Sequence, residues 1–205
     1  MSLDFVAFDL ETTGIEADLH SIVEIGAVRF RDGEPGETFG TLVDPERDIP
    51  YEASQVSGIT TEMVKGQPKI QDVLNDFATF CGDDILVAHN AKFDYKFVCN
   101  AIKKHGSKAG TGCLLDSYGL AKTVVSGISN HRLDMLVNHF EITATVFHRA
   151  EADAAYCGLV FARIVRALQR SGEACDVQAL MKLADQKEMK LPQVPQSSQE
   201  QLGLF

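Results

Sequence analysis

Two acidic residues near the start of the chain, Asp9 and Glu11, are spaced so that they could bind a metal ion. They lie in Phe5-Val6-Ala7-Phe8-Asp9-Leu10-Glu11, whose aromatic, β-branched and small apolar residues are typical of a buried strand. Side chains two apart on a strand lie on the same face, so both carboxylates should project together from its carboxyl end. Two carboxylates this close repel each other unless a proton or a cation lies between them. The pair therefore predicts a divalent-metal site.

Three further residues come from the ends of other predicted elements. Asp94 follows the apolar strand 85–88, at the end of the strand where open α/β sheets place their sites. His148 and Asp153 lie at the start of a long predicted helix. Oxygen ligands without cysteine or paired histidines favour a hard cation such as Mg²⁺ or Mn²⁺ over zinc. Two such ions are the usual apparatus for attack of water on a phosphodiester.

The hydrophobic pattern predicts the frame that holds these residues. The first strand should pair in a three-stranded meander with strands at 21–30 and 37–43, joined by a tight turn at Asp32-Gly33. Alternating strands and helices follow, which predicts an α/β fold with a mixed sheet flanked by helices. We expect a short helix near 58–63, helices at 70–80, from about 92 to 105, around 120, at 133–140 and at 150–168, and strands at 85–88 and 113–115.

The character of the sequence changes after Arg170. We expect a domain over residues 1–170, a helical appendage over 171–190 that contains an amphipathic segment at 177–184, and a flexible tail over 191–205. The tail is polar and contains prolines, a composition typical of disorder.

Composition narrows the class of protein. The chain has 205 residues, of which 45% are hydrophobic, and its formal net charge is −10. Because it has no apolar run long enough to span a bilayer and no segment resembling a signal peptide, we expect a cytoplasmic protein that does not bind membranes. Five scattered cysteines argue against a disulfide framework. The negative charge does not exclude a nuclease, because a carboxylate site recruits cations that then meet the phosphate.

Three segments in this order resemble a known family. Phe8-Asp9-Leu10-Glu11-Thr12-Thr13-Gly14, His89-Asn90-Ala91-Lys92-Phe93-Asp94 and His148-Arg149-Ala150-Glu151-Ala152-Asp153 are similar to the three motifs of the DEDDh 3′→5′ exonucleases, and especially of proofreading epsilon subunits of bacterial DNA polymerase III. The similarity spans about residues 4–170 and includes Val56-Ser57-Gly58-Ile59-Thr60.

The resemblance implies a fold and a role for each acidic residue. The fold would be RNase H-like, with a mixed five-stranded sheet. Asp9, Glu11 and Asp153 would bind the first of two metal ions, Asp9 would bridge to the second, and Asp94 would hold the second directly or through water. His148 would be the general base, since the pKa of histidine lies near neutrality.

Substrate contacts follow from the same resemblance. Thr12 and Thr13 would meet the terminal nucleotide, Phe93 and Ile59 would pack against or between the last bases, and His89 and Asn90 would shape the site. Phe93 and Ile59 could equally belong to the core, because apolar residues at helix starts are usually buried.

The predicted function is metal-dependent 3′→5′ exonucleolytic hydrolysis of single-stranded or frayed DNA ends, releasing nucleoside monophosphates in proofreading or repair. One alternative is an exonuclease that trims RNA, similar to oligoribonuclease or ribonuclease T, because recognition of the 2′-OH is local. Another is a catalytically silent binding protein associated with a sliding clamp. The chain has no room for a polymerase domain, so any role in synthesis would require a polymerase subunit as partner.

The last residues of the chain resemble a peptide that binds a partner protein. Gln201-Leu202-Gly203-Leu204-Phe205 places three large apolar side chains in a polar tail, where exposure gains nothing for them. The pattern is similar to peptides that dock on the bacterial sliding clamp, with Gln201 as polar anchor and Leu202, Leu204 and Phe205 in an apolar pocket.

Overall fold

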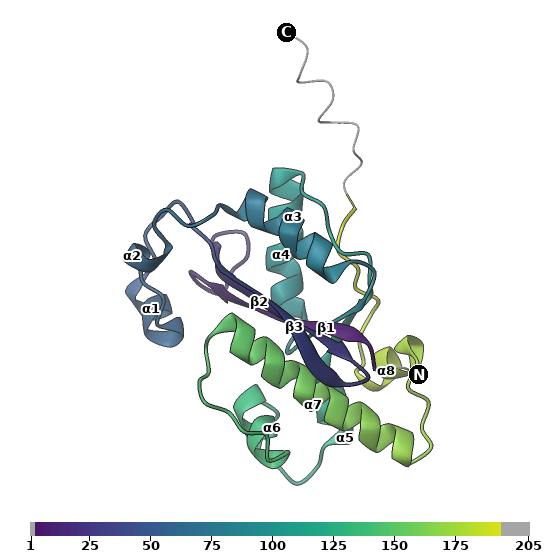
Figure 1. Cartoon of the computed structure of the whole chain (residues 1–205). Coiled ribbons are helices and arrows are strands. Elements are labelled where there is room, and N and C mark those ends of the chain that lie inside the picture. Colours follow the sequence, from purple (N-terminus) through teal and green to yellow (C-terminus); the bar gives the residue numbers. More distant parts are fainter. Residues whose placement is uncertain (1–2, 194–205) are drawn as a thin grey trace.

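A mixed five-stranded sheet forms the centre of the molecule (Figure 1). The computed structural model describes residues 3–193. The strand order is β3-β2-β1-β4-β5, with β1, β2 and β3 antiparallel and with β4 and β5 parallel to β1. The expected meander and the expected mixed sheet are thereby confirmed. The strands are β1 (Phe5–Thr12), β2 (Ile22–Arg31), β3 (Glu34–Leu42), β4 (Ile85–Ala88) and β5 (Leu114–Asp116).

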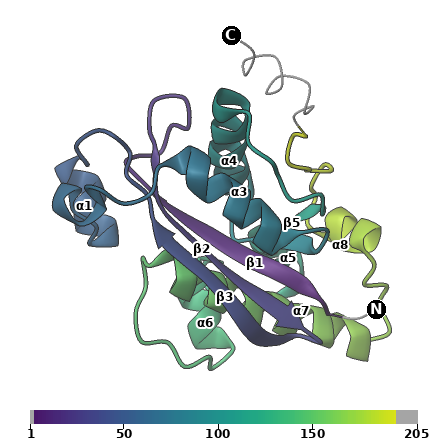
Figure 2. The same ribbon diagram turned by 45° about the horizontal axis from the view of Figure 1, so that its top comes forward.

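Helices cover both faces of the sheet (Figures 1 and 2). Helices α3 (Ile70–Cys81) and α4 (Lys92–His105) lie on one face, and α7 (Ala150–Arg170) lies on the other with α5 (Ser117–Val124) and α6 (Leu133–His139). Side chains of β1 alternate between the two layers. Val6, Phe8 and Leu10 join the core under α3 and α4, whereas Phe5 and Ala7 join the core under α7. The same alternation puts Asp9 and Glu11 on the α7 face.

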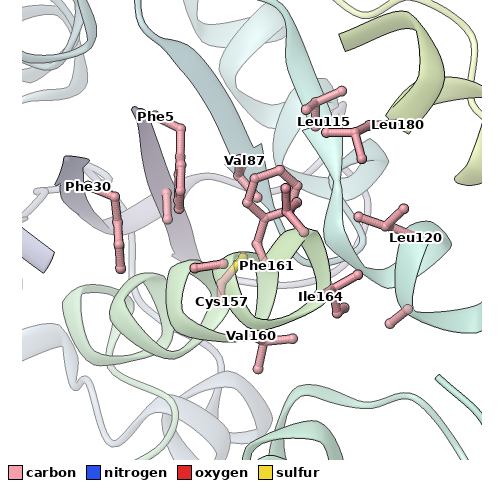
Figure 3. Close-up of a cluster of buried hydrophobic side chains, with 14 of the residues drawn as sticks. Phe5, Phe30, Val87, Leu115, Leu120, Cys157, Val160, Phe161, Ile164 and Leu180 are labelled. Carbon is pink, nitrogen blue, oxygen red and sulfur yellow. The ribbon is translucent and has the colours of Figure 1, made fainter. Parts of the chain in front are cut away.

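An aromatic group fixes α7 beneath β1 (Figure 3). The ring of Phe5 stacks on Phe30, with centroids 4.7 Å apart, and meets Phe161 of α7 edge-on at 5.0 Å. Gly158 lets Phe30 lie against the helix, since a Cβ there would be 2.1 Å from that ring. Burying one large apolar side chain contributes roughly 1.5–3 kcal/mol, so this contact holds α7 firmly against the sheet.

One helix was not predicted. Helix α1 (Tyr51–Ser57) fills a stretch for which no helix or strand was predicted, while α2 (Thr61–Val64) is the short helix expected near 58–63. Pro50 precedes α1 and Gly58, at φ 71°, ends it in the left-handed region. Only Ser57 of α1 is buried, so its sequence lacks the apolar period that reveals longer helices.

Residues 171–190, predicted as an appendage, pack on the main domain. Helix α8 (Val177–Leu183) contributes Leu180 and Met181 to the core under α7. The Gln186 side chain donates to the carbonyl of Leu114 and accepts from the amide of Asp116, which joins this segment to β5.

The predicted tail begins at a residue that the structure buries, because Leu191 is only 3% exposed in the core under α3 and α4. Gln201, Leu202, Leu204 and Phe205 lie outside the described residues. Within residues 3–193, no helix is both long and apolar enough to cross a membrane.

Candidate active site

Two carboxylates on β1 face α7. Asp9 pairs with Gly26 and Glu11 pairs with Glu24 across the antiparallel ladder between β1 and β2. Glu11 is 9% exposed. The ladder register shifts between Glu11 and Thr12, the last residue of β1. The two acidic side chains therefore lie together at the carboxyl end of the strand, as their spacing predicts.

The third carboxylate, Asp94, comes from the first turn of α4 and is buried. Burial raises the pKa of Asp94 overall, although the backbone of Leu10, between the two acidic residues of β1, lies close enough to lower that pKa. The parallel pairing of β4 with β1 brings the α4 amino end to this edge. A residue remote in sequence is thereby attached to the same strand end.

His148 and Asp153 form one turn at the start of α7. The amide of His148 donates to Oδ2 of Asp153 over 2.9 Å. His148 has φ 62°, a left-handed conformation that side chains rarely adopt outside tight turns. One ligand atom from each of Glu11, His148 and Asp153 lies within 4.8 Å of the others. The structure thus brings the first and third motifs into one potential metal-binding group.

Burial and mutual repulsion disfavour charge on these carboxylates. Removal from water, assisted by Asp153 and Glu24 and opposed by Arg149, raises the pKa of Glu11 to about 7. Burial also raises the pKa of Asp9 well above its ordinary value, and the charges of Asp94 and Asp153 add to this shift. Burial likewise raises the pKa of Asp94 and of Asp153. A cation among these carboxylates would offset the free-energy cost of charging them.

One oxygen atom supplies the test of whether a cation fits. Oδ1 of Asp153 is buried and has no hydrogen-bond partner among the described residues. Such an atom costs free energy unless something else satisfies it. An all-oxygen set with one imidazole suits a hard divalent cation, so the residues fit the predicted metal. Asp9 and Asp94 are not members of the 4.8 Å group within residues 3–193, although both interact electrostatically with its members.

A groove of about 580 Å³ adjoins this site. His89, Asn90, His148 and Asp153 are among its lining residues. His89 is held by Oγ of Ser117 at 2.9 Å and by the carbonyl of His131 at 3.0 Å. Asn90 is exposed and has φ 62°. His89 and Asn90 therefore lie beside the candidate site, and their role in shaping it stays a prediction.

The predicted nucleotide contacts differ in their accessibility. Thr12 is half-buried, whereas Thr13 is buried with its hydroxyl accepting from the amide of Ser21 at 3.0 Å. Phe93 is half-buried against Phe97, with ring centroids 4.9 Å apart.

Ile59 does not reach the site with its side chain. It is fully buried in a small core with Val23, Ile49 and Val64. Because none of its surface is accessible, the structure gives it a core role in place of the predicted wedge between bases.

Sequence reasoning missed Glu24 and Arg149. Glu24 is buried, and its carboxylate pairs with the Arg149 guanidinium, with Oε1 and Nη2 2.7 Å apart. A signal was present in the sequence, because Glu24 is the single acidic residue in the apolar run 22–30. A buried acid needs a partner, so its position alone indicates a specific contact.

Comparison with known proteins identifies the class. An exonuclease family model, RNase_T, matches residues 6–161. The chain is 36% identical over 163 residues to the DNA polymerase III epsilon subunit of Treponema pallidum, covering 78% of this chain and 76% of that subunit. It is 37% identical to the PolC-type DNA polymerase III of Halalkalibacterium halodurans, covering 80% of this chain but 11% of that polymerase. The chain thus spans about a tenth of the length of that relative.

Solved structures agree with this result. Exonuclease X in complex with 5′-overhanging duplex DNA matches with a TM-score of 0.69 and 25% identity, covering 88% of this chain and 99% of that one. Escherichia coli exonuclease I with a dT13 oligonucleotide has a similar fold, with a TM-score of 0.70, 16% identity and coverage of 82% of this chain and 42% of that one.

The fold and the comparisons thus place this chain in a class of exonuclease domains with an RNase H-like sheet. The chain belongs to the RNase_T exonuclease family, and within it resembles epsilon and PolC exonuclease regions. The predicted fold class and the predicted resemblance to the DEDDh 3′→5′ exonucleases are confirmed.

Proposed function

We propose that this chain removes nucleoside monophosphates from the 3′ ends of single-stranded or frayed DNA, using two divalent ions, Mg²⁺ or Mn²⁺. The observation that carries the proposal is the buried, unpartnered Oδ1 of Asp153 in a group with Glu11 and His148. A binding protein that had lost catalysis would have no need to keep an unsatisfied carboxylate beside other acids. This argues against the catalytically silent alternative.

Each residue has a distinct task in this proposal. Asp9, Glu11 and Asp153 would hold one ion, and Asp9 and Asp94 the other. When bound, the ions would supply Lewis-acid chemistry by neutralising charge that develops on the phosphodiester. His148, exposed at the rim, accepts the proton of the attacking water. The hydrogen bond from the backbone amide of His148 to the Asp153 carboxylate keeps this base beside the acidic group.

Substrate contacts are assigned to accessible residues near the groove. Asn90 and His89 line the groove. Thr12, at the end of β1, and Phe93, in α4, are partly accessible to solvent. An aromatic ring holds unpaired bases without regard to their sequence, which suits a frayed end. Buried Thr13 contributes through the fold of the loop that follows β1.

We propose DNA as the substrate in place of RNA. The support is that the named relatives are DNA polymerase III proteins and a DNA-bound exonuclease. The test is to digest matched 3′-labelled DNA and RNA oligonucleotides side by side. Faster release of deoxynucleotides supports the proposal. Preferential release of ribonucleotides would favour RNA trimming instead.

A role in replication would require partners. The resemblance to an epsilon subunit suggests proofreading with a polymerase subunit or repair synthesis. Gln201, Leu202, Leu204 and Phe205 would tether the chain to a sliding clamp. Such a tether raises the local concentration of exonuclease at a primer end without changing the active site.

A further inference from the structure

We propose that Glu24 is a positioning residue that fixes the amino end of α7, and with it His148 and Asp153, opposite Asp9 and Glu11. The inference rests on the proposed hydrolytic function, because it assigns a task within that site. Glu24 itself belongs to β2 and is absent from all three motifs.

Within residues 3–193, the hydrogen bonds of the Glu24 carboxylate go to Arg149 and Ala150, at the start of α7. Its Oε2 accepts from the backbone amide of Ala150 at 2.9 Å, and its Oε1 accepts from Nη2 of Arg149 at 2.7 Å. Nε of Arg149 lies 3.2 Å and 3.3 Å from the two oxygens. The carboxylate thus binds the residue before the helix and the first residue within it. Asp153 follows three positions later and His148 comes just before.

A glycine beside Glu24 brings the two backbones into contact. A Cβ on Gly26 would lie 2.0 Å from the amide nitrogen of Glu151 and 2.1 Å from the carbonyl carbon of Ala150. Glu24 and Gly26 are two apart on β2 and therefore share the face toward α7. They are also the ladder partners of Glu11 and Asp9. The helix is therefore attached to the residues directly opposite the acidic pair.

Charge balance alone does not explain Glu24. It adds a buried negative charge to a site that already contains four carboxylates, and it therefore increases repulsion within the group. Repulsion between Asp153 and the acids of β1 should push the first turn of α7 outward. The hydrogen bonds from Arg149 and Ala150 oppose that movement. Arg149 also offsets part of the added charge, so the pair retains the helix at limited electrostatic cost.

Two substitutions separate positioning from charge. Glu24→Gln keeps the shape and removes the charge, whereas Glu24→Asp keeps the charge and shortens the reach by one methylene. Positioning requires both charge-assisted bonds and reach, so both variants should lose kcat by between about tenfold and a hundredfold, the scale of a small misplacement. KM for a short single-stranded DNA should change less than about twofold. Mn²⁺ affinity, measured by calorimetry, should weaken in both.

A matched control lies at the other end of the same helix. Arg166 of α7 pairs with Glu34 of β3 over 2.8 Å, and Glu34 is largely exposed. Glu34→Gln removes a strand-to-helix ion pair remote from the acidic group. It should leave kcat and Mn²⁺ affinity as in the unmodified protein.

The outcomes are decisive. Wild-type kcat in Glu24→Asp with loss only in Glu24→Gln would overturn positioning in favour of a field effect, and wild-type kcat in both would overturn any role. If thermal melting shows that either variant is unfolded, Arg149→Ala tests the same contact while leaving the Ala150 bond, and retention of full kcat there overturns the proposal. If the unmodified protein hydrolyses no substrate, the proposed function fails. In that case, the Mn²⁺ affinity of the folded Glu24 variants decides the inference. Weaker affinity supports it, and unchanged affinity overturns it.

Discussion

The amide of His148 and the Oδ2 of Asp153 are joined by a 2.9 Å hydrogen bond, so the proposed base and a proposed metal ligand belong to one structural unit. The bond uses the backbone of His148 and leaves its imidazole available. A mutation at His148 should therefore remove the base and preserve metal binding, whereas a mutation at Asp153 should affect both.

Replacing the imidazole should impair proton transfer while preserving metal binding. His148→Ala keeps the backbone donor to Asp153 and should lower turnover by on the order of a hundredfold or more. The pH dependence of turnover should differ between the variant and the unmodified protein, because the proposed base is absent from the variant. Calorimetric Mn²⁺ titration provides the control, and a large loss of affinity would make His148 a ligand instead of the base.

Removing a metal-binding carboxylate should abolish both metal binding and turnover. Asp9→Ala or Asp153→Ala deletes a ligand and a charge, so Mn²⁺ binding and turnover should fall together below detection. Chelator should have the same effect on the unmodified enzyme, and excess Mg²⁺ or Mn²⁺ should restore it. The control is Glu37→Gln, which changes an exposed carboxylate that pairs with Arg29. Full activity in chelator would rule out a metal-dependent reaction.

The metal-free protein should lose stability as pH rises. Burial raises the pKa of Glu11 from 4.5 to about 7, so the folded state binds this proton more tightly than the unfolded state does. The resulting stability is complete below about pH 4.5 and is lost as pH rises through about 7. Melting temperature without metal should therefore decrease between pH 5 and pH 8.

Glu11→Gln tests this origin. It should raise the melting temperature of the metal-free protein at pH 8 by a few degrees, with little effect at pH 4. Mn²⁺ should raise the melting temperature of the unmodified protein at pH 8 and do so much less in the variant. A variant less stable than the unmodified protein at pH 8 would contradict the argument.

Gly158 should tolerate no side chain. A Cβ there would lie 2.1 Å from the Phe30 ring, which itself stacks on Phe5. Gly158→Ala should destabilise the fold by about 1–3 kcal/mol, the usual cost of overpacking, despite alanine's better helix propensity. Urea unfolding measures this cost. Ala152→Gly, at a half-buried position of the same helix, gives the reference for a propensity effect alone.

Deleting residues 202–205 should separate docking from catalysis. Hydrolysis of a short free oligonucleotide should remain unchanged, whereas binding to the sliding clamp of the same organism should be lost. Affinity of the full chain should be near micromolar, because a peptide ordered on binding loses part of its contact free energy. Equal clamp binding by both forms would disprove the motif. A lower melting temperature on truncation would indicate packing on the domain.

The sequence by itself determined the strand that presents Asp9 and Glu11, because alternation along a strand is a local property. It also predicted that Asp94, His148 and Asp153 contribute to the site, since their motifs are short and ordered along the chain. The structure brings His148 and Asp153 beside Glu11, and it places Asp94 close enough to Asp9 to raise the pKa of that carboxyl. Strand β4 was predicted with its observed bounds, because four apolar residues are bounded by turn residues and by the second motif.

Only the tertiary structure decided how α7 is attached. Glu24 and Arg149 are 125 positions apart, and no local pattern connects them. Their contact depends on Gly26 admitting the α7 backbone against β2, which is a matter of packing between surfaces. The burial of Ile59 was decided in the same way, because its neighbours Val23, Ile49 and Val64 come from separate segments. Periodicity shows that a residue has an apolar side, whereas the packed fold determines what covers it.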